Sequence, residues 1–409
     1  MKSNGNFLEI YVTFSLLKPS IYREGDKQGR YEKEVRIKRM LYIFLALLML
    51  LSAFPASATN QGSGISDEAV IYIDADTAFA DCEDATIVVV PEGQLATIAG
   101  YAKSLVDSDK ILYIADTSRN KEALAEYLSI PNSTTSVYNN MPHIAAVIYK
   151  AGNHYVFSYI YVQIDPGPYA ADAESSTISS SAAEALSLDE LVDMDDALAS
   201  ALDLYNAANQ APLLIAGARA LPSGADATYS DVVKIYSSSG ALLGDGLATQ
   251  YLYKKGYGTV NGQQMYIFDV ITSFKGAPNA STYLQTYQGR MHCNINGHTL
   301  IDYSVLPSNT STSSSIQLSG GGLSGGTSWT FTPDSQIITT TGVPSSKYVD
   351  YLGRPQVYRY GHTWEMLPGI RAASTNGAGS RGAFSKLTIP VYGILGTVRE
   401  YNLEVGGWF

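Results

Sequence analysis

The pattern of apolar and polar positions changes character near residue 230. Before that point, short β-branched runs alternate with segments whose apolar residues recur at helical spacing. This order is typical of a parallel sheet covered by helices. Strands are predicted at 70–73, 86–90, 110–115 and 212–216, and helices at 94–106, 118–128 and 189–206. We therefore expect an α/β region with a mostly parallel sheet over residues 59–230.

Two features interrupt this alternation. Apolar runs at 143–149 and 155–164 flank a polar segment that contains glycine, a pattern typical of a β-hairpin. The segment 165–187 is rich in Pro, Ala and Ser and therefore predicts a flexible loop or linker.

Beyond residue 230, the apolar positions follow the period of β-strands. Asn261-Gly262 and Asn296-Gly297 each lie between two strand-like runs. Asn-Gly tolerates the positive φ of a type I′ turn, so each pair predicts a hairpin. Further strands are predicted at 315–318, 328–332, 336–340, 356–360 and 386–392. We expect an antiparallel β-sandwich or jelly-roll-like domain over 231–409, which makes the whole chain an α+β multidomain protein.

A hydrophobic stretch near the N-terminus has the parts of a signal peptide in their usual order. Basic residues precede an uncharged apolar run over 40–54, and a proline and the small residues 56–58 follow it. The run is shorter than the roughly 20 apolar residues that a spanning helix needs. We expect a signal peptide over 40–58 that is cleaved between Ala58 and Thr59. A retained membrane anchor is the alternative.

Residues 1–39 show no sustained period, and Met40 after them is itself a suitable start. We expect residues 1–39 to be a non-native upstream extension; the alternative is a cytoplasmic tail on an anchored protein. Either way, the signal predicts export by the general secretory route to the cell surface, the envelope or the extracellular space.

Charge argues against several classes of partner. Of the 27 Lys and Arg and 38 Asp and Glu in the chain, nine and five precede Met40, which leaves 18 and 33 and a net charge of −15. Nucleic acids and anionic membranes attract clustered Lys and Arg, so neither is an expected partner. A membrane would be contacted only through an uncleaved N-terminal segment.

Other features of the composition suit a protein outside the cytoplasm. The chain has 30 tyrosines, which favour half-buried sheet surfaces and interfaces. Asn132, Asn279 and Asn309 begin N-x-[ST] triplets and are possible glycosylation sites. Export also permits a disulfide between Cys82 and Cys293, the only two cysteines; two unpaired, partly buried thiols are the alternative.

Motifs with catalytic associations lack their structural context. G-x-S-x-G at 322–326 needs a strand before its serine and a helix after it, but a Ser/Gly segment precedes it and a strand-like run follows. G-x-G-x-x-G at 320–325 and 377–382 likewise does not join a strand to a helix. We therefore predict glycine-rich loops at these positions, with no catalytic or cofactor-binding residue.

Metal binding has two candidate regions. In a hairpin turning at 296–297, His298 would share a face with Cys293 while His292 would point to the other face, and two ligands rarely suffice for a metal ion. Two acidic clusters could supply oxygen ligands to calcium, although acidic residues also favour loops and helix N-termini. They comprise Asp74, Asp76, Asp81, Glu83 and Asp84, and Asp189, Glu190, Asp193, Asp195 and Asp196. We therefore predict that the chain has no metal-binding residue and no cofactor. A bound calcium ion is the alternative.

The first half of the chain contains a faint internal echo. Segments 96–128 and 197–233 each combine an alanine-rich helix, a polar break and a short strand. "DDALASAL" at 195–202 and "APLLIAG" at 211–217 resemble the α/β repeats of secreted cell-wall-binding, surface-layer-type proteins. The resemblance covers 86–128 and 197–233 and implies non-catalytic attachment to an envelope polymer. It assigns no individual site residue.

We therefore expect an exported cell-envelope protein with a structural, adhesive or surface-layer-like role and no catalytic activity. Its partners would be an envelope polymer or other copies of itself. The first alternative is a secreted hydrolase or carbohydrate-binding protein with an aromatic-lined groove in the β-rich domain. A second is a soluble protein that binds a ligand between its halves. The aromatic candidates for a groove are Tyr348, Tyr351, Tyr358, Tyr360 and Trp364.

N-terminal sequencing of the protein from its native cells tests the export signal. The small residues before position 59 form the cleavage site, so the mature chain is expected to begin at Thr59. A chain that begins at Met40 or Met1 would instead support the retained anchor.

Overall fold

The computed structural model of the protein describes thirteen segments of the chain. It describes residues 70–132, 135–137, 139–165, 192–209, 221–278, 287–294, 298–306, 314–323, 326–331, 336–355, 363–375, 381–392 and 398–409. The predicted signal peptide, the upstream extension, the strand at 212–216 and all but the first residue of the predicted linker lie outside these ranges.

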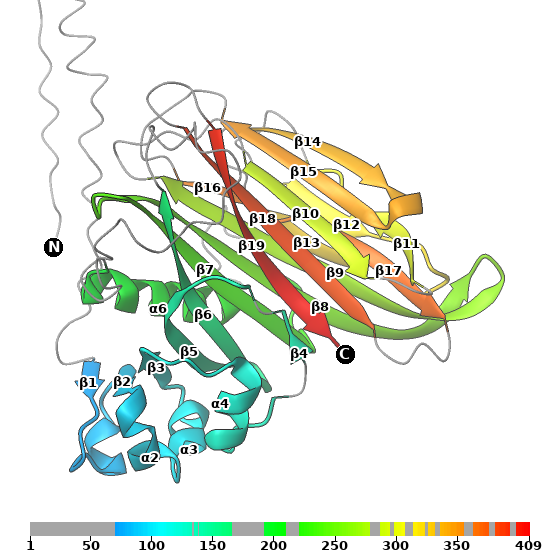
Figure 1. Ribbon diagram of the computed structural model, residues 1–409. Helices are drawn as coiled ribbons and strands as arrows, with labels where there is room; N and C mark the ends of the chain where they lie inside the picture. Colours follow the sequence, from blue (N-terminus) through cyan, green and yellow to red (C-terminus); the bar gives the residue numbers. More distant parts are fainter. Residues whose placement is uncertain are drawn as a thin grey trace, which may run out of the picture. The chain divides into compact units, whose positions relative to one another are not determined.

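The chain is mostly β, and its largest element is a sheet of eleven strands in the described residues (Figure 1). The strands follow one another in the order β1-β2-β3-β5-β6-β7-β8-β9-β17-β11, and β16 also pairs with β9. Their bounds are β1 Val70–Tyr72, β2 Ile87–Pro91, β3 Ile111–Ala115, β5 His143–Ala151, β6 His154–Asp165, β7 Ala227–Ser237, β8 Leu242–Val260, β9 Gln263–Pro278, β11 His298–Tyr303, β16 Trp364–Met366 and β17 Gly369–Thr375.

A second sheet of six strands has the order β14-β15-β10-β18-β19-β4 in the described part of the chain. Its bounds are β4 Thr135–Ser136, β10 Tyr287–Asn294, β14 Gln336–Val343, β15 Tyr348–Pro355, β18 Gly382–Tyr392 and β19 Val398–Trp408. β12 (Ser314–Leu318) and β13 (Thr327–Phe331) form a separate hairpin.

The predicted parallel sheet is present only in part. β1, β2 and β3 pair in parallel, as do β6 and β7, whereas β5 is antiparallel to both β3 and β6. The predicted first helix is divided into α2 (Leu95–Ile98) and α3 (Ala102–Asp107), and the second corresponds to α4 (Lys121–Tyr127). The third helix is α6 (Met194–Asn209), and the tail of the second repeat-like segment is β7, a strand.

The large sheet continues through the position where the sequence pattern changes. Residue 230 lies inside β7, which pairs with β6 on one side and with β8 on the other. The regions 59–230 and 231–409 therefore share one sheet. Near this position, the layer that packs on one face of the large sheet changes from α2, α3 and α4 to the six-stranded sheet.

Two predicted hairpins are confirmed and one is wrong. β5 and β6 turn at Gly152, and β8 and β9 turn at Asn261 and Gly262, whose φ values of 50° and 79° fit a type I′ turn. The Asn296-Gly297 pair lies between strands of different sheets, because β10 pairs with β15 and β18 while β11 pairs with β17. Both edges of β10 are occupied, so β11 cannot pair with it.

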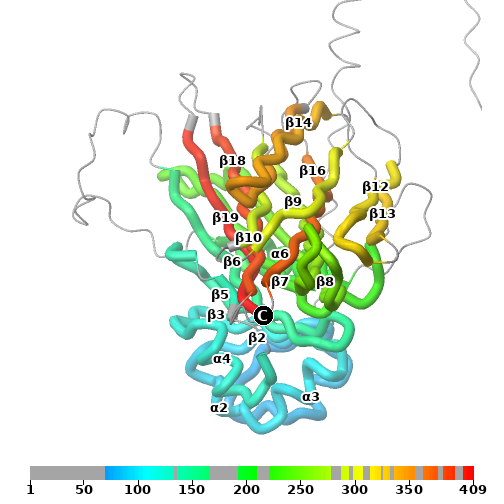
Figure 2. The backbone as a smooth tube through the Cα atoms, turned by 90° about the vertical axis from the view of Figure 1, so that its right-hand side faces the viewer, coloured from blue at the N-terminus to red at the C-terminus, as the bar shows by residue number. Residues whose placement is uncertain are grey.

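The sheets and helices form layers around a shared core. One apolar cluster packs α2, α3 and α4 against the N-terminal strands of the large sheet. Farther along this sheet, the same cluster packs the six-stranded sheet against β7, β8 and β9. A second cluster lies on the opposite face, beneath α6. Figure 2 shows α2, α3 and α4 together at one end of the sheet, away from β14 and β18.

Reciprocal aromatic contacts join the two large sheets. The Tyr287 ring of β10 lies on Gly276 of β9, and the Trp364 ring of β16 lies on Gly353 of β15. The two rings stack with centroids 4.3 Å apart and planes 14° apart. A Cβ at either glycine would collide with the ring above it, so each sheet needs a glycine where the other inserts an aromatic ring.

A buried ion pair fixes the β12–β13 hairpin to the large sheet. Arg371 of β17 donates from Nε and Nη2 to the two carboxylate oxygens of Asp269 of β9, at 2.6 and 2.7 Å. Thr327 of β13 also donates to Asp269, and Arg371 Nη1 donates to the Gly320 carbonyl at 3.0 Å. Both charged side chains are almost completely buried, and their mutual bidentate contact compensates for lost hydration.

A second buried pair anchors α4. Lys121 Nζ lies 3.0 and 2.9 Å from the carboxylate oxygens of Asp231 on β7, and the Tyr159 backbone N–H donates to Asp231 at 2.6 Å. Burial raises the pKa of Asp231 to about 6, against the opposing effect of the Lys121 charge. The N-terminal helix layer is thus tied to the strand that spans the change of pattern.

Substituting alanine for Gly276 or Gly353 should destabilise the protein by about 1–3 kcal/mol each, because the added methyl group forces Tyr287 or Trp364 out of the inter-sheet core. Equilibrium denaturant unfolding measures the loss. Gly93→Ala is the matched control, since a Cβ there meets nothing within 4 Å. Equal stabilities for all three variants would contradict the aromatic-on-glycine packing.

Candidate binding face of the six-stranded sheet

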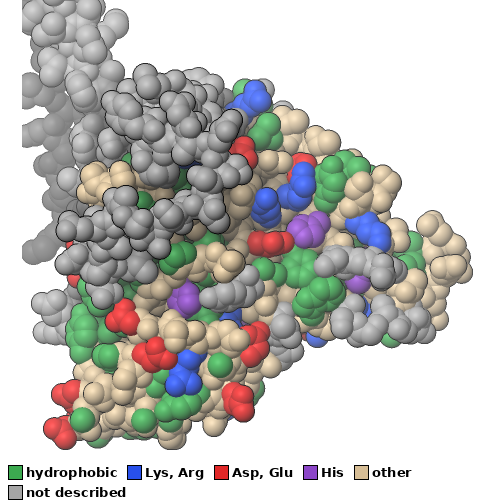
Figure 3. Space-filling view, viewed as in Figure 1, with side chains coloured by type: hydrophobic (Ala, Val, Ile, Leu, Met, Phe, Trp, Pro, Cys, Tyr) green, Lys and Arg blue, Asp and Glu red, His purple; other side chains and the backbone are tan. Residues whose placement is uncertain are grey.

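The strands of the six-stranded sheet alternate between a buried and a partly exposed face. Met291, Leu387 and Leu403 point toward the large sheet and belong to the shared core. We call the opposite side of the sheet the outer face, and Figure 3 shows it with acidic, basic and histidine side chains gathered over these strands. It carries Gln288, Arg290, His292, Tyr348, Asp350, Leu352, Phe384, Lys386, Thr388, Asn402, Glu404 and Trp408.

An aromatic row crosses the outer face. The strand register places His292 of β10 between Tyr348 of β15 and Phe384 of β18. His292 and Phe384 stack with centroids 5.6 Å apart, and Phe384 meets Trp408 of β19 edge to face at 5.4 Å. Phe384 is buried beneath its neighbours, whereas Trp408 is 36% exposed. The row therefore offers partly exposed rings on a buried aromatic support.

A charged row lies beside the aromatic one. In register order it runs Asp350, Arg290, Lys386 and Glu404. Arg290 Nε and Nη2 donate to the two oxygens of Asp350 at 2.6 and 2.9 Å, and its guanidinium lies 4.3 Å from the Tyr348 ring centroid. Nε2 of His292 lies 3.4 Å from Oε1 of Glu404. Two acidic and two basic residues give this row no net formal charge.

A third row provides neutral hydrogen-bonding groups. Gln288 of β10 pairs in register with Leu352 and with Thr388, and Thr388 in turn pairs with Asn402 of β19. Thr388 Oγ1 donates to Asn402 Oδ1 at 2.7 Å, which orients the amide. Amides and hydroxyls both donate and accept, so the row can match a ligand that carries many hydroxyl groups.

The structure separates the aromatic residues that the sequence grouped. Tyr348 lies on the outer face, but Tyr351 and Trp364 are almost fully buried between the sheets. Tyr358 and Tyr360 lie outside the described residues. Sequence alone raised His292 only as a candidate metal ligand and did not single out Phe384 or Trp408, because the three residues lie far apart in sequence and meet only through the pairing of β10, β18 and β19.

The two cysteines are free thiols, and both are buried. Burial raises the pKa of Cys293 to about 12, which favours the neutral thiol. His298 and His292 belong to strands of different sheets, and the described residues contain no group of three or more His, Cys, Asp or Glu side chains placed to hold a metal ion.

The acidic residues that were candidates for calcium take local hydrogen bonds. Asp74 accepts from Thr77 Oγ1 at 2.7 Å and from the Asp76 N–H at 3.0 Å, and Asp81 accepts from the Ala78 N–H at 2.7 Å. Asp193 accepts from the N–H of Asp195 at the start of α6. Glu83, Asp84 and Asp196 also lie in the described residues, whereas Asp189 and Glu190 lie outside them.

The remaining sequence candidates lie in loops or outside the described residues. Asn132 is partly exposed after α4, whereas Asn279 and Asn309 are outside these ranges. Gly320, Gly321 and Gly322, which belong to two of the glycine motifs, follow β12 with positive φ values. Within the described residues, no helix is both long and apolar enough to span a membrane.

Comparisons with known proteins give no family. No family model matches the sequence, and no curated protein does. The delta-toxin of Clostridium perfringens is 11% identical, with 44% of this chain and 87% of the toxin covered and a TM-score of 0.26. The NetB toxin of that species in its membrane-inserted form is 7% identical, with 40% of this chain and 94% of the toxin covered and a TM-score of 0.19.

A cohesin module from the family 33 glycoside hydrolase of Clostridium perfringens is 12% identical, with 38% of this chain and 92% of the module covered and a TM-score of 0.21. TM-scores this low do not establish a shared fold, and no function is transferred from any of these proteins.

His298 should make the fold sensitive to acid. Burial, with smaller effects from the charges of Lys347 and Arg381, lowers the pKa of His298 to about 4. The unfolded chain binds this proton near pH 6.5, so the contribution to stability is complete above that pH and is lost as the pH falls toward 4.

Between pH 7 and pH 4, the wild type should therefore lose up to about 3 kcal/mol more stability than His298→Phe, as measured by urea unfolding at each pH. An identical pH dependence for the two proteins would show that His298 is not held neutral by burial.

Proposed function

We propose that this chain is an exported, non-catalytic envelope protein that attaches to a neutral polysaccharide through the outer face. The observation that carries the proposal is the order of side chains across that face, where an aromatic row, a charge-balanced row and an amide-hydroxyl row lie side by side. The export signal predicted over 40–58 supplies the location.

The chemistry of a sugar polymer matches these rows. A pyranose ring has an apolar face of C–H groups, which packs on aromatic rings such as Tyr348 and Trp408, and an edge of hydroxyls, which exchange hydrogen bonds with amides and charged groups. The two rows beside the rings contain both donors and acceptors. A sheet surface also suits an extended polymer better than an enclosed small molecule.

The balance of charge favours a neutral polymer over a charged one. The acidic Asp350 and Glu404 flank the basic Arg290 and Lys386, so neither sign prevails on the face. A polyanion needs clustered Lys and Arg, and its binding weakens steeply as salt is added. Binding to a neutral polysaccharide should change little between low and high salt.

Trp408→Ala and Tyr348→Ala should each weaken binding to purified neutral cell-wall polysaccharide by at least about tenfold, equivalent to 1.4 kcal/mol, because each removes a ring from the aromatic row. Co-sedimentation isotherms give the affinities. Tyr257→Ala is the matched control, since Tyr257 is a 49% exposed tyrosine of β8, outside the six-stranded sheet.

Unchanged binding by Trp408→Ala, or an equal loss in Tyr257→Ala, would overturn the assignment of the outer face. Binding that disappears in high salt would instead indicate a polyanion or a charged protein as the partner.

A further inference from the structure

The six-stranded sheet ends at β14, and no strand among the described residues pairs with the other edge of β14 (Figure 1). Along a strand, the backbone N–H and C=O groups of successive residues point alternately to its two sides. About four of the eight residues of β14 therefore direct both groups away from β15. Such a row of backbone groups is a template on which a further strand can pair.

β14 differs from the other strands at the ends of the two large sheets. β1 has three residues and β4 has two, while β11 has a register shift between Leu300 and Asp302 and carries the charge of Asp302. Short length, bulges and charged side chains are the usual means by which proteins prevent pairing at an edge. The sequence of β14 is QIITTTGV, with no charge, no proline and a regular register. β14 therefore has none of these protections.

The side chains of β14 divide between the two faces of the sheet. The Tyr303 ring of β11 lies on Gly342, so the even-numbered residues face the large sheet. Ile337, Thr339 and Thr341 are exposed on the opposite side, and all three are β-branched and uncharged. β-Branched side chains pair favourably across neighbouring strands. A strand that joins this edge would meet them there.

The chemistry of the edge favours a second copy of β14 over a strand of another protein. Without a charge, β14 has no means of selecting an oppositely charged strand. Two antiparallel copies place uncharged, β-branched side chains opposite one another. A twofold axis at Thr339 or at Thr340 brings almost the whole of both strands into register, because residues of the same face then stand opposite. Each copy uses its β14 edge once, so the pairing closes at a dimer.

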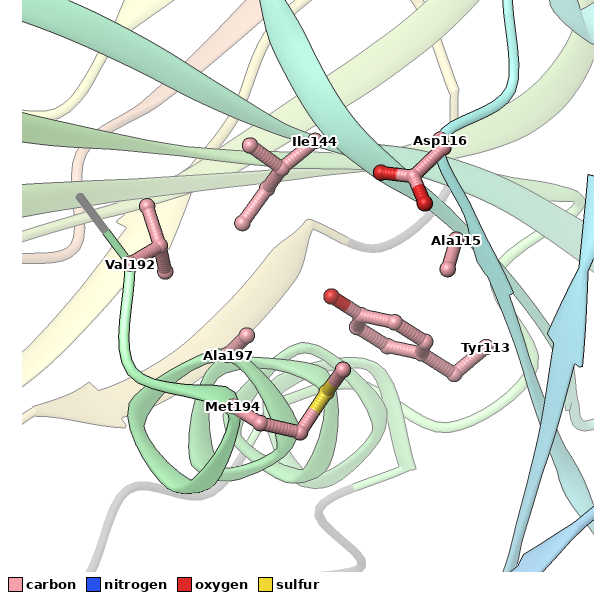
Figure 4. A pocket seen from close by; sticks show the side chains of 7 residues that line it. All are labelled: Tyr113, Ala115, Asp116, Ile144, Val192, Met194 and Ala197. Carbon is pink, nitrogen blue, oxygen red and sulfur yellow. The ribbon is translucent and has the colours of Figure 1, made fainter. Parts of the chain in front are cut away.

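The contact consists of main-chain pairing, with about eight backbone hydrogen bonds between the two strands. The cavity of about 240 Å³ in Figure 4 adds nothing to it, because that cavity lies between β3, β5 and α6 and β14 does not line it. A pair of strands alone buries less surface than the roughly 1,200–2,000 Å² of most stable interfaces. We therefore expect a weak dimer.

We propose that β14 pairs antiparallel with β14 of a second copy of this chain, which joins the two six-stranded sheets into one continuous sheet. The twofold axis is perpendicular to the sheet, so the outer faces of both copies lie on the same side. One polysaccharide chain could then contact both outer faces. That consequence rests on the proposed function, whereas the pairing itself does not.

Sedimentation equilibrium of the whole protein, without polysaccharide, tests the pairing. We expect a monomer–dimer equilibrium with a dissociation constant of about 10 µM. Thr339→Lys should weaken the dimer at least about tenfold, because the two lysines lie close to the twofold axis and repel each other. Thr299→Lys is the matched control, since Thr299 is an exposed threonine of β11, and it should leave the dissociation constant unchanged.

A mixture of Thr339→Lys and Thr339→Glu distinguishes a blocked edge from a damaged fold. Each variant alone should be mostly monomeric, whereas the mixture should form a mixed dimer because opposite charges meet near the axis. The proposal is overturned if the wild type stays monomeric up to about 300 µM or forms species larger than a dimer. It is also overturned if the two lysine variants dissociate equally or if the mixture stays monomeric. Because no polysaccharide is present, none of these results bears on the proposed function.

Discussion

The two large sheets pack around a shared apolar core that contains the stacked rings of Tyr287 and Trp364, and the rest of the structure depends on this packing. Each ring belongs to one sheet and lies on a glycine of the other, so the contact sets both the spacing and the lateral position of the sheets. This packing turns one face of the six-stranded sheet inward to the core. The opposite face remains for the aromatic, charged and neutral rows that form the outer face.

The distance along the chain between paired strands explains which hairpins could be predicted from sequence. The turn at Asn261-Gly262 joins neighbouring strands, so the local signal of a type I′ turn suffices. Asn296-Gly297 has the same local signal, but β15 and β18 occupy both edges of β10, and the chain crosses to the other sheet. The pairing partners of β10 lie 56 to 100 residues away along the chain, and such distant pairing leaves no local signal in the sequence.

The candidate binding face was only partly predictable for a related reason. Tyr348 and Tyr351 are three positions apart on β15, so alternation places them on opposite faces, but the sequence does not reveal which face meets the other sheet. His292, Phe384 and Trp408 lie far apart along the chain. They meet only when β10, β18 and β19 pair in their observed register.

We propose that the protein meets an envelope polysaccharide at the outer face. A crystal structure of the protein with an oligosaccharide of that polymer would test this proposal most directly. We expect sugar rings packed on Tyr348 and Trp408, with sugar hydroxyls hydrogen-bonded to the charged row and to the amide-hydroxyl row. Sugar bound elsewhere on the protein, with the outer face bare or covered by another protein chain, would contradict it.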